Sequence, residues 1–199
     1  MIKKISKLIT TVFVNNSIIK AEDRDIYNYC FEITIVSIMS YLILLILSIL
    51  LNEFVCSLIF LVSFTVFRKI SGGYHTSNYI KCFIMSITSY LLMILVIKKY
   101  FQIFVGNYFM LAVGLIIIIL FSPIQDRNKP FTNKQYKIFK FLSKSLAILL
   151  LLIFTILQLS ELQYFFINEY YFSFCYGIDL VAFSLLISKI RRRFKDAKN

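Results

Sequence analysis

Hydrophobic residues gather in six long runs that charged residues border but rarely enter. In chain order the runs are Ile33–Leu51, Phe54–Phe67, Cys82–Ile97, Phe101–Phe121, Ser145–Ser160 and Tyr171–Ser188. Because a bilayer core is ~30 Å thick, a helix needs about 20 residues to cross it. The pattern predicts an all-α, polytopic integral membrane protein with about six transmembrane helices. The second and third runs are short. Either their helices extend into the polar stretch between them, or the chain there lies below the membrane surface.

The first 30 residues carry a different pattern, in which apolar residues are spaced rather than continuous. They recur at helical spacing and fall on one helix face: Ile5, Leu8, Ile9, Val12 and Phe13. Lysines lie near that face, so we expect an N-terminal amphipathic helix in the membrane interface. A soluble helix that caps the bundle is the alternative. The segment lacks the continuous apolar stretch and small-residue cleavage site of a signal peptide.

Composition agrees with the hydropathy pattern. Hydrophobic residues make up 59% of the 199 residues and charged residues only 16%, whereas soluble domains are nearer half apolar and carry more charge. We find no internal repeat, and we expect one membrane-embedded domain over residues 1–199.

The net charge of +12 has a positional explanation. Basic residues cluster in 1–32, 68–81, 122–144 and 189–199, and Lys98 and Lys99 alone fall elsewhere. Six spans put all four clusters on one side of the membrane, which the positive-inside rule identifies as cytoplasmic. We therefore expect a multi-pass protein of a bacterial cell membrane with both termini in the cytoplasm. Topology accounts for the charge, so no nucleic-acid partner is expected.

Residues 122–144 form the largest polar segment, SPIQDRNKPFTNKQYKIFKFLSK. Pro123 should end the fourth span, and Pro130 should keep the loop irregular. From Gln135 onward the spacing permits a basic helix at the inner membrane surface. The alternative is that these lysines are only a positive-inside stop signal.

The four cysteines show no metal-ligand spacing, and one histidine cannot complete a usual zinc site. Cys56 and Cys175 lie in apolar runs, where cysteine behaves as a small hydrophobic residue. Cys30 and Cys82 complete the set, and their distribution does not suggest a disulfide framework. We expect no metal and no cofactor.

Residues 68–82, RKISGGYHTSNYIKC, carry the chemistry. The only histidine, His75, precedes Cys82 by seven residues, and a neighbouring imidazole can convert a thiol into a nucleophilic thiolate. On a continuous helix the two residues would be ~10.5 Å apart along the axis, whereas a hydrogen bond needs about 3 Å. The segment must therefore bend.

The residues between the two short runs are suited to such a bend. Gly72 and Gly73 permit backbone conformations that other residues avoid. Three N-cap residues follow, so we expect a helix to begin near Ser77 and to carry Cys82 in its early turns: Thr76, Ser77 and Asn78. Arg68 could bind a carboxylate or stabilise developing negative charge. The alternative is a cytoplasmic loop with an incidental histidine and cysteine, since the spacing by itself is a weak signal.

Two carboxylates belong to the candidate site. Asp179 falls near the middle of the sixth run, where an ionisable group is costly and often functional. It could orient His75, bind Arg68, or make an interhelix contact. Glu32, at the cytoplasmic end of the first span, is an interfacial or helix N-terminal charge or a partner of Arg68.

The block FRKISGGYHTSNYIKC resembles the signature of the accessory gene regulator B (AgrB) family of bacterial membrane peptidases. The matching positions are Arg68, Gly73, His75 and Cys82. The family also has a proline-containing loop with a Lys-Pro step, which Pro123 and Asn128-Lys129-Pro130 resemble. This chain departs mildly from the family pattern after the histidine, where the family often has a small residue and this chain has Thr76. The hydropathy and order of elements agree over most of the chain, but only this block is specific.

The resemblance implies a cysteine endopeptidase that processes a small quorum-sensing propeptide. His75 and Cys82 would be catalytic, and Arg68, Gly73 and Lys129 would support the oxyanion or bind substrate. The enzyme would remove the C-terminal tail of a propeptide with an amphipathic N-terminus and an acidic tail. An acyl-thioester on Cys82 would then close a thiolactone or lactone ring. The resemblance also implies a homodimer.

Two other functions fit the sequence. A non-enzymatic transporter or export partner for a small hydrophobic peptide would use the polytopic spans, Asp179 and the basic inner face. A structural membrane subunit would tolerate replacement of the histidine and cysteine.

Overall fold

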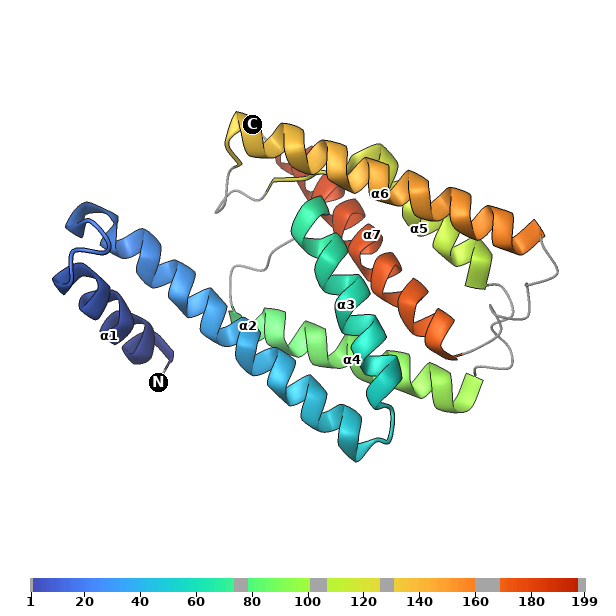
Figure 1. Ribbon diagram of the computed structural model, residues 1–199, viewed down its shortest axis with the longest axis horizontal. Coiled ribbons are helices and arrows are strands. Elements are labelled where there is room, and N and C mark those ends of the chain that lie inside the picture. The colour runs from blue at the N-terminus through green and yellow to red at the C-terminus, as the bar shows by residue number, and fades with distance from the viewer. Residues whose placement is uncertain (1, 74–78, 101–106, 126–130, 160–168, 197–199) are drawn as a thin grey trace. The chain divides into compact units, whose positions relative to one another are not determined.

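The protein is built from helices throughout the part of the chain that its structure, a computed structural model, describes: residues 2–73, 79–100, 107–125, 131–159 and 169–196 (Figure 1). The elements are α1 (Ile2–Asn15), the short 3-10 helix η1 (Ala21–Asp23), α2 (Arg24–Leu50), α3 (Phe54–Ser71), α4 (Tyr79–Tyr100), α5 (Asn107–Phe121), α6 (Asn133–Leu159) and α7 (Glu169–Asp196). No strand occurs in these residues, and the only β-type pairing among them is an isolated parallel bridge between Gly72 and Ile124. The predicted all-α membrane protein is confirmed.

Four stretches of helix are long and apolar enough to cross a membrane: Ala21–Leu50, Phe54–Ser71, Asn133–Leu157 and Glu169–Arg191. A shorter apolar helix covers Tyr108–Phe121. The remaining helix, α4, has 22 residues and ends with Lys98 and Lys99 in its last turn. In the residues that the structure describes, each of the six hydrophobic runs thus overlaps one of the helices α2 to α7.

Helix boundaries follow local chemistry. The helix of the second run continues beyond the apolar residues to Ser71. This agrees with the expectation that the helices of the short runs extend into the polar stretch between them. Helix α5 ends at Phe121, two residues before Pro123. Helix α6 begins with a reciprocal cap, in which the Gln135 N–H donates to Thr132 Oγ1 at 3.3 Å and the Thr132 N–H donates to Gln135 Oε1 at 3.1 Å. Residues 133–144 are therefore helical and continuous with the fifth span.

The chain divides into two compact units. The N-terminal unit comprises residues 1–51 and 76–90, and the core unit comprises residues 52–75 and 91–199. In the N-terminal unit, α1 packs along α2. The buried side chains of α1 are Ser6 and Thr10, whereas its apolar stripe is exposed: Ile5, Leu8 and Val12. Phe13 makes an edge contact with Phe31 of α2, with ring centroids 5.3 Å apart.

In the core unit, α7 packs against α3 and α5, and α6 packs against α5 and α3 (Figure 1). Side chains of these helices interlock in one apolar cluster, whose fully buried members include Leu115, Ile118, Ile178, Val181 and Leu185. Glycines permit close approach at two contacts. A Cβ at Gly177 of α7 would collide with Ser63 of α3, and a Cβ at Gly114 of α5 would collide with Asp179 of α7. Small residues serve this purpose in membrane helix packing.

Candidate functional site

Cys82 lies in the first turn of α4, which begins at Tyr79, close to the predicted start near Ser77. His75 falls in residues 74–78 and Lys129 in residues 126–130, and both lie outside the described residues. The pairing of His75 with Cys82 therefore stays a prediction. The structure does show that α3 ends at Ser71 and that the next described helix begins at Tyr79. The described chain therefore leaves α3 at Gly72 and Gly73, before His75, and is helical at Cys82.

Helix α3 ends in a glycine cap. The Gly72 N–H donates to the Arg68 carbonyl oxygen at 3.1 Å, and Gly72 has a φ of 70°. Gly73 follows with a φ of 115°. Both values lie in the region that glycine adopts readily and other residues avoid. The two glycines turn the chain away from α3 two residues before His75.

The chain after α3 is joined to the chain after α5 by backbone hydrogen bonds. The Ile124 N–H donates to the Ser71 carbonyl oxygen at 3.0 Å, and the Gly73 N–H donates to the Ile124 carbonyl oxygen at 3.3 Å. Ser71, Gly73 and Ile124 are all buried. The polar segments 68–82 and 122–144, about fifty residues apart in sequence, therefore start side by side.

Arg68 joins this bridge to α7. Its Nη1 donates to the Gly72 carbonyl oxygen at 2.8 Å and to Ser184 Oγ at 2.7 Å. A Cβ at Gly73 would collide with both Arg68 Nη1 and Ser184 Oγ. We call Arg68, Gly72, Gly73, Ile124 and Ser184 the loop clamp. Arg68 and Gly73 were candidates from the sequence, whereas Ser184 and Ile124 were missed because neither carries a local signal of function.

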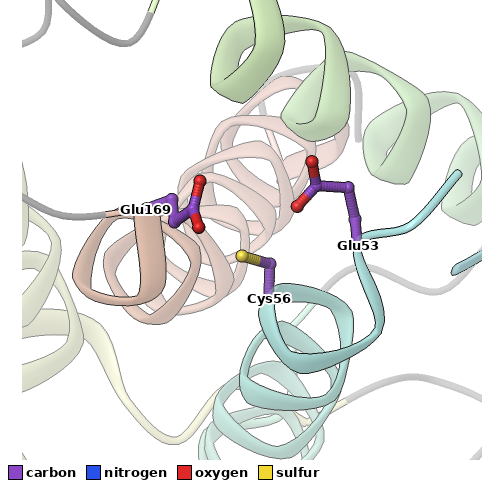
Figure 2. A group of neighbouring side chains, drawn as sticks. All are labelled: Glu53, Cys56 and Glu169. Carbon is purple, nitrogen blue, oxygen red and sulfur yellow. The ribbon is translucent and has the colours of Figure 1, made fainter.

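A second polar group lies at the opposite ends of α3 and α7, where both helices begin (Figure 2). Glu53, Cys56 and Glu169 bring their ligand atoms within 4.8 Å of one another. The Cys56 side chain is buried and the two glutamates are half-buried. Carboxylates and a thiolate can bind a divalent cation such as Zn²⁺. No local sequence pattern indicates this group, because Glu169 is more than a hundred positions from Glu53 and Cys56.

The helices themselves offer another explanation for these acidic residues. Glu53 is the N-cap residue of α3 and Glu169 is the first residue of α7, and negative charge is stabilised at helix N-termini. Ser57 and Ser173 donate to the carbonyl oxygens of Glu53 and Glu169 at 2.6 and 2.7 Å, respectively. This hydrogen bonding is internal to each helix. The group can therefore be understood without a bound ion.

The two carboxylates singled out from the sequence lie in different units. Asp179 is a half-buried residue of α7 that packs against Gly114 of α5. Its Oδ2 is buried and has no hydrogen-bond partner among the described residues. These contacts are interhelical, in line with the packing role considered for it. Glu32 is a half-buried residue of α2 in the N-terminal unit.

Comparison of the sequence with known proteins identifies the family to which this chain is similar. The sequence profile of the family described as accessory gene regulator B matches residues 6–186. A protein of Clostridium perfringens (strain 13 / Type A) named AgrB-like protein 2 is 30% identical over 144 residues, which cover 69% of this chain and 67% of that protein. An AgrB-like protein of Clostridium perfringens (strain SM101 / Type A) is 27% identical over 144 residues, with the same coverage. No solved structure matches.

Proposed function

This chain belongs to the accessory gene regulator B family, and from that premise we propose that it is a membrane-embedded cysteine endopeptidase. Family membership gives it a role in the accessory gene regulator system. The proposed substrate is a small quorum-sensing propeptide with an amphipathic N-terminus and an acidic C-terminal tail. The proposed products are the released tail and a cyclic thiolactone or lactone peptide.

In the first step, His75 accepts the thiol proton of Cys82, and the thiolate attacks a peptide carbonyl carbon of the propeptide. The tetrahedral intermediate collapses with cleavage of the C–N bond. The same proton passes from the imidazolium to the departing amine, which becomes the new N-terminus of the released tail. The rest of the peptide stays on the Cys82 sulfur as an acyl-thioester.

In the second step, a cysteine or serine side chain within the bound peptide attacks the thioester carbonyl. His75 accepts the proton of this nucleophile and returns it to the departing Cys82 sulfur, so the enzyme is regenerated. Ring closure is intramolecular, and a high effective concentration of the internal nucleophile lets it compete with water. A site at the edge of the membrane also limits access of water.

The observation that supports the proposal is that the chain leaves helix α3 at Gly72 and Gly73, two residues before His75. Helix α3 ends at Ser71, α4 begins at Tyr79, and Cys82 lies in the first turn of α4. A single helix through residues 75–82 would separate imidazole and thiol by ~10.5 Å along its axis, so we propose that the chain bends between the two residues. A thiolate early in a helix also gains some stabilisation from the helix dipole.

The surroundings suit an acidic substrate tail. The segment that contains Lys129 starts at Ile124, which hydrogen-bonds the chain beside Gly73. Exposed lysines follow in the first part of α6: Lys134, Lys137 and Lys140. We propose that Lys129 and these lysines attract the tail and that this side of the protein faces the cytoplasm. Homodimer formation stays an expectation from the family resemblance.

The test is cleavage of a propeptide carrying a C-terminal epitope tag, co-expressed with the full chain in bacterial membranes. We expect Cys82→Ala and His75→Ala each to abolish tag release, because one removes the nucleophile and the other the base. Cys30→Ala is the matched control, since Cys30 is an exposed cysteine of α2, and it should cleave like the unaltered chain.

Membrane insertion of each variant is measured by extraction and immunoblotting of the full chain. Tag release by an inserted Cys82→Ala or His75→Ala variant would rule out the peptidase. If the unaltered chain instead accumulated intact peptide in vesicles without cutting it, the protein would be a peptide transporter.

A further inference from the structure

The N-termini of α3 and α7 account for negative charge at Glu53 and Glu169, but they do not explain where the two carboxylates point. Glu53 is the N-cap residue of α3, yet its side chain makes no capping hydrogen bond. Its carboxylate and that of Glu169 lie instead on either side of the Cys56 sulfur (Figure 2). All three residues belong to the core unit. Their side chains thus converge on one point, which helix capping does not require.

The thiol adds a ligand of a different kind. Cys56 is only 2% exposed and forms no disulfide, and its sulfur is directed at the two carboxylates (Figure 2). Ser173 also lies beside the sulfur, but its hydroxyl is neutral and donates to the Glu169 carbonyl oxygen at 2.7 Å. A cysteine that served only as a small hydrophobic residue would have apolar neighbours. Carboxylates around a buried thiol are unfavourable unless a positive charge joins them.

Lysine and arginine do not neutralise this group. Neither glutamate forms an ion pair with them among the described residues, and residues 160–168, which precede Glu169, contain neither type. With the thiol ionised, the three side chains carry three negative charges. Both helices begin here, and each N-terminus offsets about half a charge, so about two negative charges remain. A divalent cation balances them.

We propose that Glu53, Cys56 and Glu169 bind a Zn²⁺ ion that ties the start of α3 to the start of α7. A thiolate favours zinc over magnesium or calcium, and three protein ligands leave one tetrahedral position for water. Binding displaces the thiol proton to solvent. Ligand atoms in a tetrahedral zinc site lie about 3.5 Å apart. The three here lie within 4.8 Å of one another, so rotations of the two half-buried glutamate side chains complete the coordination.

The test uses the purified full chain in detergent, with any affinity tag removed and metal stripped by a chelator. Co²⁺ serves as the spectroscopic stand-in for Zn²⁺. We expect Co²⁺ to produce the near-ultraviolet absorption of a cobalt–thiolate bond and Zn²⁺ to displace it. Cys56→Ser should lose this absorption. Glu53→Gln and Glu169→Gln should each weaken Zn²⁺ binding at least about tenfold, since loss of even an outer-shell partner costs about 10–100-fold.

Cys30→Ser is the matched control, because Cys30 is an exposed cysteine of the N-terminal unit. It should keep both the absorption and the affinity for Zn²⁺. If Cys56→Ser does not fold, the unfolding midpoint decides, since a bound ion stabilises the folded state. Zn²⁺ should raise the midpoint of the unaltered chain and of Cys30→Ser, but not that of Glu169→Gln, which keeps the side-chain shape and removes only the charge.

The proposed metal site does not depend on the proposed peptidase, and the two can fail separately. Absence of the cobalt–thiolate absorption in the unaltered chain, or its persistence in Cys56→Ser, would overturn the metal site whatever the result of propeptide cleavage. Loss of the absorption in Cys82→Ser but not in Cys56→Ser would assign the ion to the proposed nucleophile and would overturn it equally.

Discussion

At Gly73 a single hydrogen atom in place of a side chain makes the loop clamp possible. The residue has a φ of 115°, and a Cβ there would occupy the space of Arg68 Nη1 and Ser184 Oγ. Alanine would thus meet two separate obstacles: a backbone conformation that costs about 1–3 kcal/mol and the displacement of the guanidinium. The requirement for glycine follows from the packing of three segments as well as from the turn.

We therefore predict that Gly73→Ala abolishes release of the propeptide tag while the full chain still inserts into the membrane. Ser71→Ala, two positions earlier, is the control. Ser71 is buried and its Oγ has no hydrogen-bond partner among the described residues, so loss of the hydroxyl should be nearly neutral. Tag release in the two variants is the measurement, and equal release would contradict the importance of the clamp.

At the scale of helices, the buried face of α1 differs from the apolar face that its hydropathy pattern predicts. The apolar stripe predicted from the sequence is real, but Ile5, Leu8 and Val12 of that stripe are exposed. The buried residues of α1 are Ser6 and Thr10, whose hydroxyls donate to carbonyl oxygens of their own helix. Small side chains let helices approach closely, and the exposed stripe remains free to enter the lipid interface.

The contact between α3 and α7 depends on Gly177. A Cβ at this position would collide with Ser63 and would lie 3.0 Å from the Phe60 carbonyl oxygen and the Phe64 nitrogen. We predict that Gly177→Val lowers the unfolding midpoint of the full chain in detergent, with a loss of about 1–3 kcal/mol as is typical of overpacking. Thermal unfolding followed by circular dichroism measures this.

Phe183→Val is the control on the same helix, because Phe183 is 60% exposed and its replacement leaves no internal cavity. It should leave the midpoint almost unchanged. If Gly177→Val were as stable as this control, close packing at Gly177 would not hold α3 and α7 together.

At the scale of the whole molecule, the distribution of charge predicts how the chain lies in the membrane. Lys99 belongs to the pair expected outside the cell, and Lys140 belongs to a basic cluster expected inside. Both side chains are exposed on described helices. We predict that Lys99→Cys reacts with a membrane-impermeant maleimide in intact cells, whereas Lys140→Cys reacts only after permeabilisation. Peptide mass spectrometry identifies the labelled cysteine, and the reverse result would invert the topology and move the proposed site outside.

The sequence by itself determined the helices. The six apolar runs lie within or overlap helices α2 to α7. Pro123 follows the end of α5, and the chain leaves helix α3 at Gly72, between the second and third runs. These features depend on hydropathy, glycine and proline, which act within a few residues of where they stand. The candidate pair His75 and Cys82 comes from the sequence in the same way and stays a prediction.

Only the tertiary structure decided which segments meet. It joined Ser71–Gly73 to Ile124, brought Ser184 to Arg68, and gathered Glu53, Cys56 and Glu169. The physical reason is that lipid-facing and buried helix faces are equally apolar in a membrane protein, so hydropathy does not reveal which faces pack together. Close contacts at glycines and hydrogen bonds between residues distant in sequence determine which helix faces pack together. These interactions form only when the helices pack.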